Sequence, residues 1–215
     1  MENKKLLITR PCYDDTTSYL HKWSEKIIEL ARKRNLTVFD LSKERVNKEE
    51  LKKFIENQQP KFLIFNGHGS DDEILGHNGS TLIKSGENHN LLKSKITYAI
   101  SCRSARKLGP DSIEVGATAY IGYKEDFIFA VDKNKATVPL FDNLAKPFFE
   151  ASNIIPFSLI KGNTVSEAYQ KSQETFQKFI DYFKAHYTLE SLHIMLLLRW
   201  DMIAQAALGD MNATF

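Results

Sequence analysis

Two residues of types that carry out nucleophilic chemistry each follow a strongly apolar run. His68 comes directly after FLIFNG, and Cys102 comes directly after ITYAIS. The thiolate is the attacking form of cysteine, and a free thiol with a pKa of about 8.5 is mostly protonated near neutral pH, so it needs a base nearby. An imidazole, with an ordinary pKa of about 6.5, can take that proton and pass it to a leaving group. His68 and Cys102 are therefore the candidate catalytic pair.

The residues beside this pair suit the same chemistry. Gly69 has no side chain, so a substrate carbonyl could approach the backbone there, and the amides of Gly69 and Cys102 are the candidate oxyanion hole. Ser101 and Ser104 lack the strand-turn-helix elbow of a serine nucleophile, and we expect them to shape the loop. Taken singly, a cysteine that ends a buried strand is commonly a small core residue, and a His-Gly pair is commonly a turn.

The two apolar runs must be neighbouring strands for this pair to form. KFLIFNGHG and KITYAISC are continuous apolar runs, typical of strands buried on both faces of a parallel sheet. Because the carboxyl ends of parallel strands meet at one edge of a sheet, His68 and Cys102 would emerge together. The sequence predicts further strands at 5–10, 37–41 and 116–123.

Helices are predicted between and after these strands. Apolar spacing predicts a helix within 17–34, Asn47 and Glu50 favour a helix start at 47, and Thr164 with Glu167 forms a capping-box pattern. The Asn-Gly pair within 73–83 predicts a small hairpin. Further helices are expected at 138–151, 164–187 and 192–208. The alternation predicts a three-layer α/β/α sandwich with a mostly parallel sheet, in a single domain of residues 1–215.

Composition narrows the classes of partner. The 29 basic and 27 acidic residues are scattered along the chain, which argues against nucleic acid. The first apolar stretch is too short for a signal peptide, and Arg199 and Asp201 interrupt the longest one, which argues against a membrane span. Two cysteines suit a reducing compartment, so the sequence predicts a cytoplasmic protein.

Metal and cofactor binding are not expected. His68, His77 and His89 have spacings that match no compact ligand motif, and Cys12 lies in a different loop. We interpret Cys12 as a structural or incidental thiol.

Four stretches carry further recognisable motifs: NGHGS at 66–70, AISCRSARKLG at 99–109, GATAYIGYKEDF at 116–127 and SEAYQKSQETF at 166–176. Together they resemble the caspase-like (clan CD) cysteine peptidases, and most of all the branch that contains the CHAT and gingipain proteases. The resemblance covers residues 60–180. It implies a caspase-like fold and a cysteine endopeptidase that acts on a protein or peptide substrate through His68 and Cys102. It also implies control by an activating protein partner, self-processing or a divalent ion.

The resemblance further implies an acidic residue at the base of the primary specificity pocket and cleavage after Arg or Lys. By position, Asp126 resembles the acidic residue after the fifth strand in separase-like relatives. Asp14 and Asp15, in the loop after the first strand, are the rival candidates, as in metacaspases. A solvated acidic turn is the alternative for each of them.

Other function classes stay open. One is a non-catalytic caspase-like interaction module or partner-activated pseudo-protease, although the presence of both His68 and Cys102 argues against it. Another is an acyltransferase or amidase that uses the same pair. Turnover of peptide bonds would separate a peptidase from both.

Overall fold

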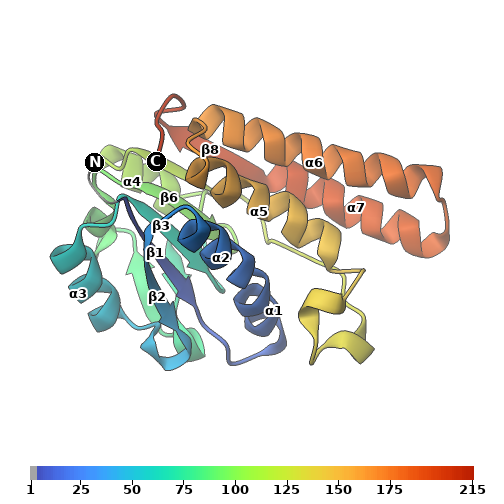
Figure 1. Cartoon of the computed structure of the whole chain (residues 1–215), viewed down its shortest axis with the longest axis horizontal. Helices are drawn as coiled ribbons and strands as arrows, with labels where there is room; N and C mark the ends of the chain where they lie inside the picture. Colours follow the sequence, from blue (N-terminus) through green and yellow to red (C-terminus); the bar gives the residue numbers. More distant parts are fainter. Residues whose placement is uncertain (1–3) are drawn as a thin grey trace.

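The five predicted strands and a sixth, unpredicted one form a six-stranded sheet in the computed structural model, which describes residues 4–215 (Figure 1). The spatial order is β2-β1-β3-β6-β7-β8, in which every neighbouring pair is parallel except β7 and β8. The strands are β1 (Lys5–Arg10), β2 (Thr37–Ser42), β3 (Phe62–Asn66), β6 (Ile96–Ile100), β7 (Ala119–Tyr123) and β8 (Gln205–Gly209).

Helices cover both faces of this sheet. One apolar cluster joins the sheet to α1 (Asp15–Trp23), α2 (Glu25–Lys33), α5 (Lys146–Ile160), α6 (Val165–Ala185) and α7 (Leu189–Ala204). A second cluster joins the other face to α3 (Lys48–Gln58), α4 (Leu108–Glu114) and the hairpin of β4 (Glu73–Leu75) and β5 (Thr81–Lys84). The predicted three-layer α/β/α sandwich is therefore confirmed.

The central strands show why their sequences are mostly apolar. Every residue of β3 and β6 is buried. Successive side chains point to opposite faces, so Phe62 and Ile64 join the first cluster while Leu63 and Phe65 join the second. A strand covered on both faces favours apolar side chains at most of its positions.

The local signals for two helix starts and for the hairpin are confirmed. Asn47 accepts a hydrogen bond from the Glu50 amide at 2.9 Å, and Thr164 forms a reciprocal capping box with Glu167. Such caps are worth about 1 kcal/mol each. In the β4–β5 hairpin, Asn78 has a positive φ of 54°, which the Asn-Gly pair tolerates.

Three predicted helices differ from the structure. The segment 17–34 forms two helices that are separated at Ser24, whose hydroxyl donates to the His21 carbonyl and so competes with the helical pattern. The segment 138–151 begins with a short 3₁₀ turn at Pro139–Phe141, and its α-helix starts only at Lys146.

The third difference concerns the apolar stretch 192–208. Its helix ends at Ala204, and the next five residues form β8 along the free edge of β7. Pairing there satisfies backbone groups that an open edge would leave to solvent. No helix within residues 4–215 combines the length and the apolar character that crossing a membrane requires.

Candidate active site

The turns after β3 and β6 carry His68 and Cys102 and are hydrogen-bonded to each other. The two strands are parallel neighbours in which Asn66 lies opposite Ile100. The Gly67 amide donates to the Ile100 carbonyl at 3.2 Å, and the Ser101 hydroxyl donates to the His68 carbonyl at 3.0 Å. The structure therefore places both residues at the same edge of the sheet.

The His68 imidazole is held by a carboxylate from the loop after β1. His68 Nε2 lies 2.7 Å from Asp14 Oδ2, while Asp14 Oδ1 accepts the Thr17 amide at 2.7 Å and so caps α1. Partial burial opposes ionisation of Asp14, but the hydrogen bonds from Thr17 and His68 outweigh it, so its pKa is lowered. Because Nε2–H donates to this carboxylate, Nδ1 of the neutral ring is left as a proton acceptor.

The thiol of Cys102 is half-buried, and its surroundings act on its pKa in both directions. Burial raises its pKa, and the negative charge of Asp126 adds to that effect. The Phe127 amide and the Arg103 charge act in the opposite direction. Within residues 4–215 no hydrogen bond joins the Cys102 sulfur to His68. Among the described residues, the two side chains thus lie on neighbouring, hydrogen-bonded turns without a direct hydrogen bond between them.

Gly69 allows the two turns to approach closely. A Cβ atom there would lie 2.0 Å from Ser101 Oγ and 2.7 Å from the Glu73 carbonyl oxygen. In the described part of the chain, the amides of Gly69 and Cys102 donate to no protein acceptor. Both of the predicted oxyanion-hole donors are thus available to a bound oxygen atom.

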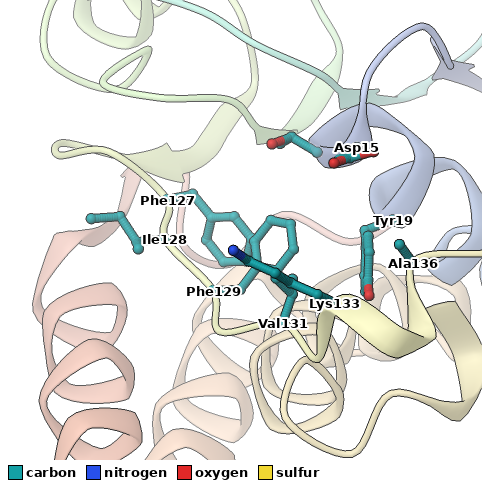
Figure 2. Close-up of a pocket in the computed structure, with 9 residues that line it drawn as sticks. Asp15, Tyr19, Phe127, Ile128, Phe129, Val131, Lys133 and Ala136 are labelled. Atoms are coloured by element: carbon teal, nitrogen blue, oxygen red, sulfur yellow. The ribbon is translucent and has the colours of Figure 1, made fainter.

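A cavity of about 500 Å³ lies between α1 and the segment after β7 (Figure 2). Neither His68 nor Cys102 is among its lining residues. Two lining residues connect it to the pair: Asp15 follows Asp14, which binds His68, and the Phe127 amide acts on the Cys102 thiol. Figure 2 shows Asp15 and Tyr19 on the side of α1, with Phe127 and Phe129 facing them. Most of the wall is apolar, and its lining residues are Asp15, Thr16, Tyr19, Phe127, Ile128, Phe129, Val131, Lys133 and Ala136.

The three candidate specificity acids occupy different positions. Asp14 is bonded to His68, and Asp15 lines the cavity without an ion-pair partner among the described residues. Asp126 is 51 % exposed and lies 3.3 Å from Arg103 Nε, outside the cavity lining. Of the three, Asp15 is the one that can meet a ligand in the cavity.

Two residues of α7 that no sequence motif pointed to also contact this region. Trp200 Nε1 donates to the Asp126 carbonyl at 2.8 Å, and Asp201 Oδ1 accepts the Ile128 amide at 3.0 Å. The only signal in the sequence was a charged residue at position 201 within an apolar stretch.

The remaining histidine and cysteine near the site form no ligand cluster. His77 packs edge-on against Tyr13, with ring centroids 5.4 Å apart, and Cys12 is a free thiol. Across residues 4–215, no three His, Cys, Asp or Glu side chains are grouped so that they could hold a metal ion.

Comparison with known proteins identifies the fold. No protein-family model and no curated protein sequence matches this chain. It is similar to the crystal structure of gingipain R (RgpB), described as an Arg-specific cysteine proteinase, with a TM-score of 0.61, 12% identity, and coverage of 98% of this chain and 47% of that one. The chain shares the fold of gingipain R.

A second gingipain structure gives the same result. The complex of Porphyromonas gingivalis RgpB pro- and mature domains matches with a TM-score of 0.59 and 9% identity, over 97% of this chain and 47% of that one. This chain therefore spans about half the length of these proteins. The predicted caspase-like fold is confirmed, whereas the CHAT branch stays a prediction.

Proposed function

We propose that this chain is a cysteine endopeptidase in which Cys102 is the nucleophile and His68 is the general base and acid. The observation that carries the proposal is the direct bonding of the two turns at neighbouring strand ends, with the imidazole held by Asp14. Similarity in fold to a cysteine proteinase supports the same assignment.

The reaction follows from the positions of these groups. His68 Nδ1 takes the thiol proton as the Cys102 sulfur attacks the substrate carbonyl carbon, and the amides of Gly69 and Cys102 stabilise the negative oxygen. The C–N bond then breaks as His68 returns the proton to the leaving amine. Water, deprotonated by His68, hydrolyses the thioester and restores the thiol.

The cavity supports a preference for Arg or Lys before the scissile bond. The aliphatic part of such a side chain would lie along Tyr19 and Phe127, and its cation would reach the unpaired carboxylate of Asp15. Lys133 also lines the cavity, and its charge opposes a basic ligand, so its position sets a limit on affinity. Asp126, paired with Arg103, is the weaker candidate.

Fluorogenic peptides with Arg, Lys, Asp or Asn before the scissile bond test this proposal. We expect hydrolysis after Arg and Lys that disappears in Cys102→Ala. Asp15→Asn should lower kcat/KM for the basic peptides by about a hundredfold, the effect of losing a charge-assisted contact. Asp126→Asn is the matched control and should change it by less than about threefold. Preferential hydrolysis after Asp would instead indicate that Lys133, and not Asp15, binds the substrate side chain in the cavity.

A partner-activated form of the same site is the second candidate. Two features favour it: burial raises the pKa of the Cys102 thiol, and among the described residues no hydrogen bond joins its sulfur to His68. If the wild-type chain hydrolyses none of the peptides, with or without calcium, a non-catalytic or partner-dependent role replaces the proposal of an independent peptidase.

A further inference from the structure

The segment 123–128 begins at Tyr123, the last residue of β7. It is hydrogen-bonded alternately to the turn that carries Cys102 and to α7. Its odd-numbered carbonyls face the turn that carries Cys102. The Ala105 amide donates to the Tyr123 carbonyl at 3.0 Å, and the Arg103 amide donates to the Glu125 carbonyl at 3.1 Å. These bonds fix one side of the segment against the nucleophile turn.

The even-numbered residues of the same segment face the C-terminal end of α7. Three bonds join them there: the Lys124 amide to the Ala204 carbonyl at 2.7 Å, Trp200 Nε1 to the Asp126 carbonyl at 2.8 Å, and the Ile128 amide to Asp201 Oδ1 at 3.0 Å. Two of the three depend on side chains of α7. The segment is therefore held between the Cys102 turn and this helix.

Phe127 lies between the two residues that α7 holds, so its amide faces the Cys102 side. On that side the Phe127 amide lowers the pKa of the Cys102 thiol and so favours the thiolate. We propose that Trp200 and Asp201 are positioning residues that hold the Phe127 amide against the Cys102 sulfur. The inference rests on the proposed function only in treating Cys102 as the reactive thiol.

Asp201 is an unfavourable residue for its position unless it serves this contact. Its side chain is fully buried, and within residues 4–215 its Oδ2 has no hydrogen-bond partner. It also lies in the last turn of α7, where the helix dipole disfavours negative charge. Burial raises its pKa well above the usual carboxyl value. Among the described residues, the bond from the Ile128 amide is the one that its side chain forms.

Substitution of Trp200 or Asp201 should therefore change the pKa of the Cys102 thiol by loosening the backbone of the segment 123–128. The charged or titratable groups around the sulfur are His68, Arg103, Asp126 and Asp201. A direct charge effect of Asp201 would raise the thiol pKa, so removing that charge would lower it. A positioning effect has the opposite sign, because a loosened Phe127 amide stabilises the thiolate less. The direction of the change distinguishes the two roles.

The test measures the rate of alkylation by iodoacetamide from pH 6 to pH 10 in a Cys12→Ala background, where Cys102 is the remaining thiol. Cys102→Ala in the same background gives the blank. Trp200→Phe removes the indole N–H, and Asp201→Ala removes the acceptor. Asp201→Asn keeps an acceptor oxygen for the Ile128 amide, and Arg199→Ala alters an exposed neighbour on α7 as the matched control.

We expect Trp200→Phe and Asp201→Ala to raise the thiol pKa and to slow alkylation at pH 7 by about three- to tenfold. Asp201→Asn and Arg199→Ala should stay near the wild type. If both Asp201 variants lower the thiol pKa, or if folded Trp200→Phe leaves it unchanged, the inference is wrong. Trp200→Phe decides the question if Asp201→Ala does not fold.

Peptide hydrolysis by the same variants separates this inference from the proposed function. Normal wild-type hydrolysis with an unchanged thiol pKa in Trp200→Phe overturns the inference and leaves the peptidase intact. Absence of hydrolysis with the expected shifts in thiol pKa overturns the peptidase and leaves the positioning role intact.

Discussion

At the scale of single residues, Asp14 both caps α1 and orients the His68 imidazole. One carboxylate oxygen caps α1 through the Thr17 amide, and the other holds His68 Nε2. The start of the helix therefore fixes the orientation of the imidazole and the nitrogen that carries its proton. A carboxylate in this position also stabilises the imidazolium that forms during proton transfer.

Asp14→Asn should separate these two effects. Asparagine caps helices as well as aspartate does, so the melting temperature should change little. With its single side-chain oxygen retained by the Thr17 cap, asparagine presents an NH2 donor to His68 Nε2 and so favours the wrong tautomer. We expect kcat to fall by about a hundredfold or more. Steady-state kinetics and thermal melts on the same samples measure both effects.

Asp14→Ala provides the comparison, because it also removes the cap and should cost about 1 kcal/mol of stability. Wild-type kcat in Asp14→Asn would show that the contact with His68 has no role in the reaction.

The residue scale also shows what the sequence could predict. His68, Gly69 and Cys102 could be placed because each follows an apolar strand, and strand ends have a fixed edge in a parallel sheet. The separate roles of Asp14 and Asp15 could not be predicted. They depend on the direction in which each side chain leaves the first turn of α1, which composition and spacing do not determine.

At the scale of elements, β8 is the strand of the sheet that the sequence pattern did not predict. The sequence continues from α7 into β8 without a Gly, Pro or Asn at the junction of Ala204 and Gln205, so no local signal marks the change from helix to strand. The buried polar side chain of Gln205 specifies the junction. Its Nε2 donates to Tyr123 Oη at 3.2 Å and to Ser172 Oγ at 3.1 Å.

Gln205→Leu should therefore destabilise the packing of β8 against α6. The substitution leaves the polar partners of Gln205 buried, and we expect the free energy of unfolding to fall by about 2–3 kcal/mol. Urea denaturation monitored by circular dichroism measures this change. Gln170→Leu, at an exposed position of α6, is the matched control and should stay within about 0.5 kcal/mol of the wild type. Equal effects of the two substitutions would contradict a specific role for the Gln205 network.

At the scale of the whole molecule, the alternation of strands and helices was enough to predict the layers, because a parallel sheet requires crossover helices on its faces. The same alternation does not predict which distant segments meet. Asp201 is an example: it is far along the sequence from Cys102, yet its side chain accepts the Ile128 amide in the segment beside Cys102. Its raised pKa predicts that global stability depends on pH.

The sign of that dependence follows from the raised pKa of Asp201. Below the ordinary carboxyl pKa of about 3.9, both the folded and the unfolded chain hold the proton, and the residue imposes no ionisation penalty. As pH rises, the unfolded chain releases the proton while the folded chain keeps it, so the free energy of unfolding falls by about 1.4 kcal/mol per pH unit. The loss stops once pH passes the raised pKa.

Asp201→Asn cannot ionise, so its stability relative to the wild type should grow over this window and then level off. Urea unfolding of both proteins from pH 4 to pH 9 measures the difference, in which the contributions of other carboxylates cancel. A difference that does not vary with pH would show that Asp201 titrates as an ordinary carboxyl group.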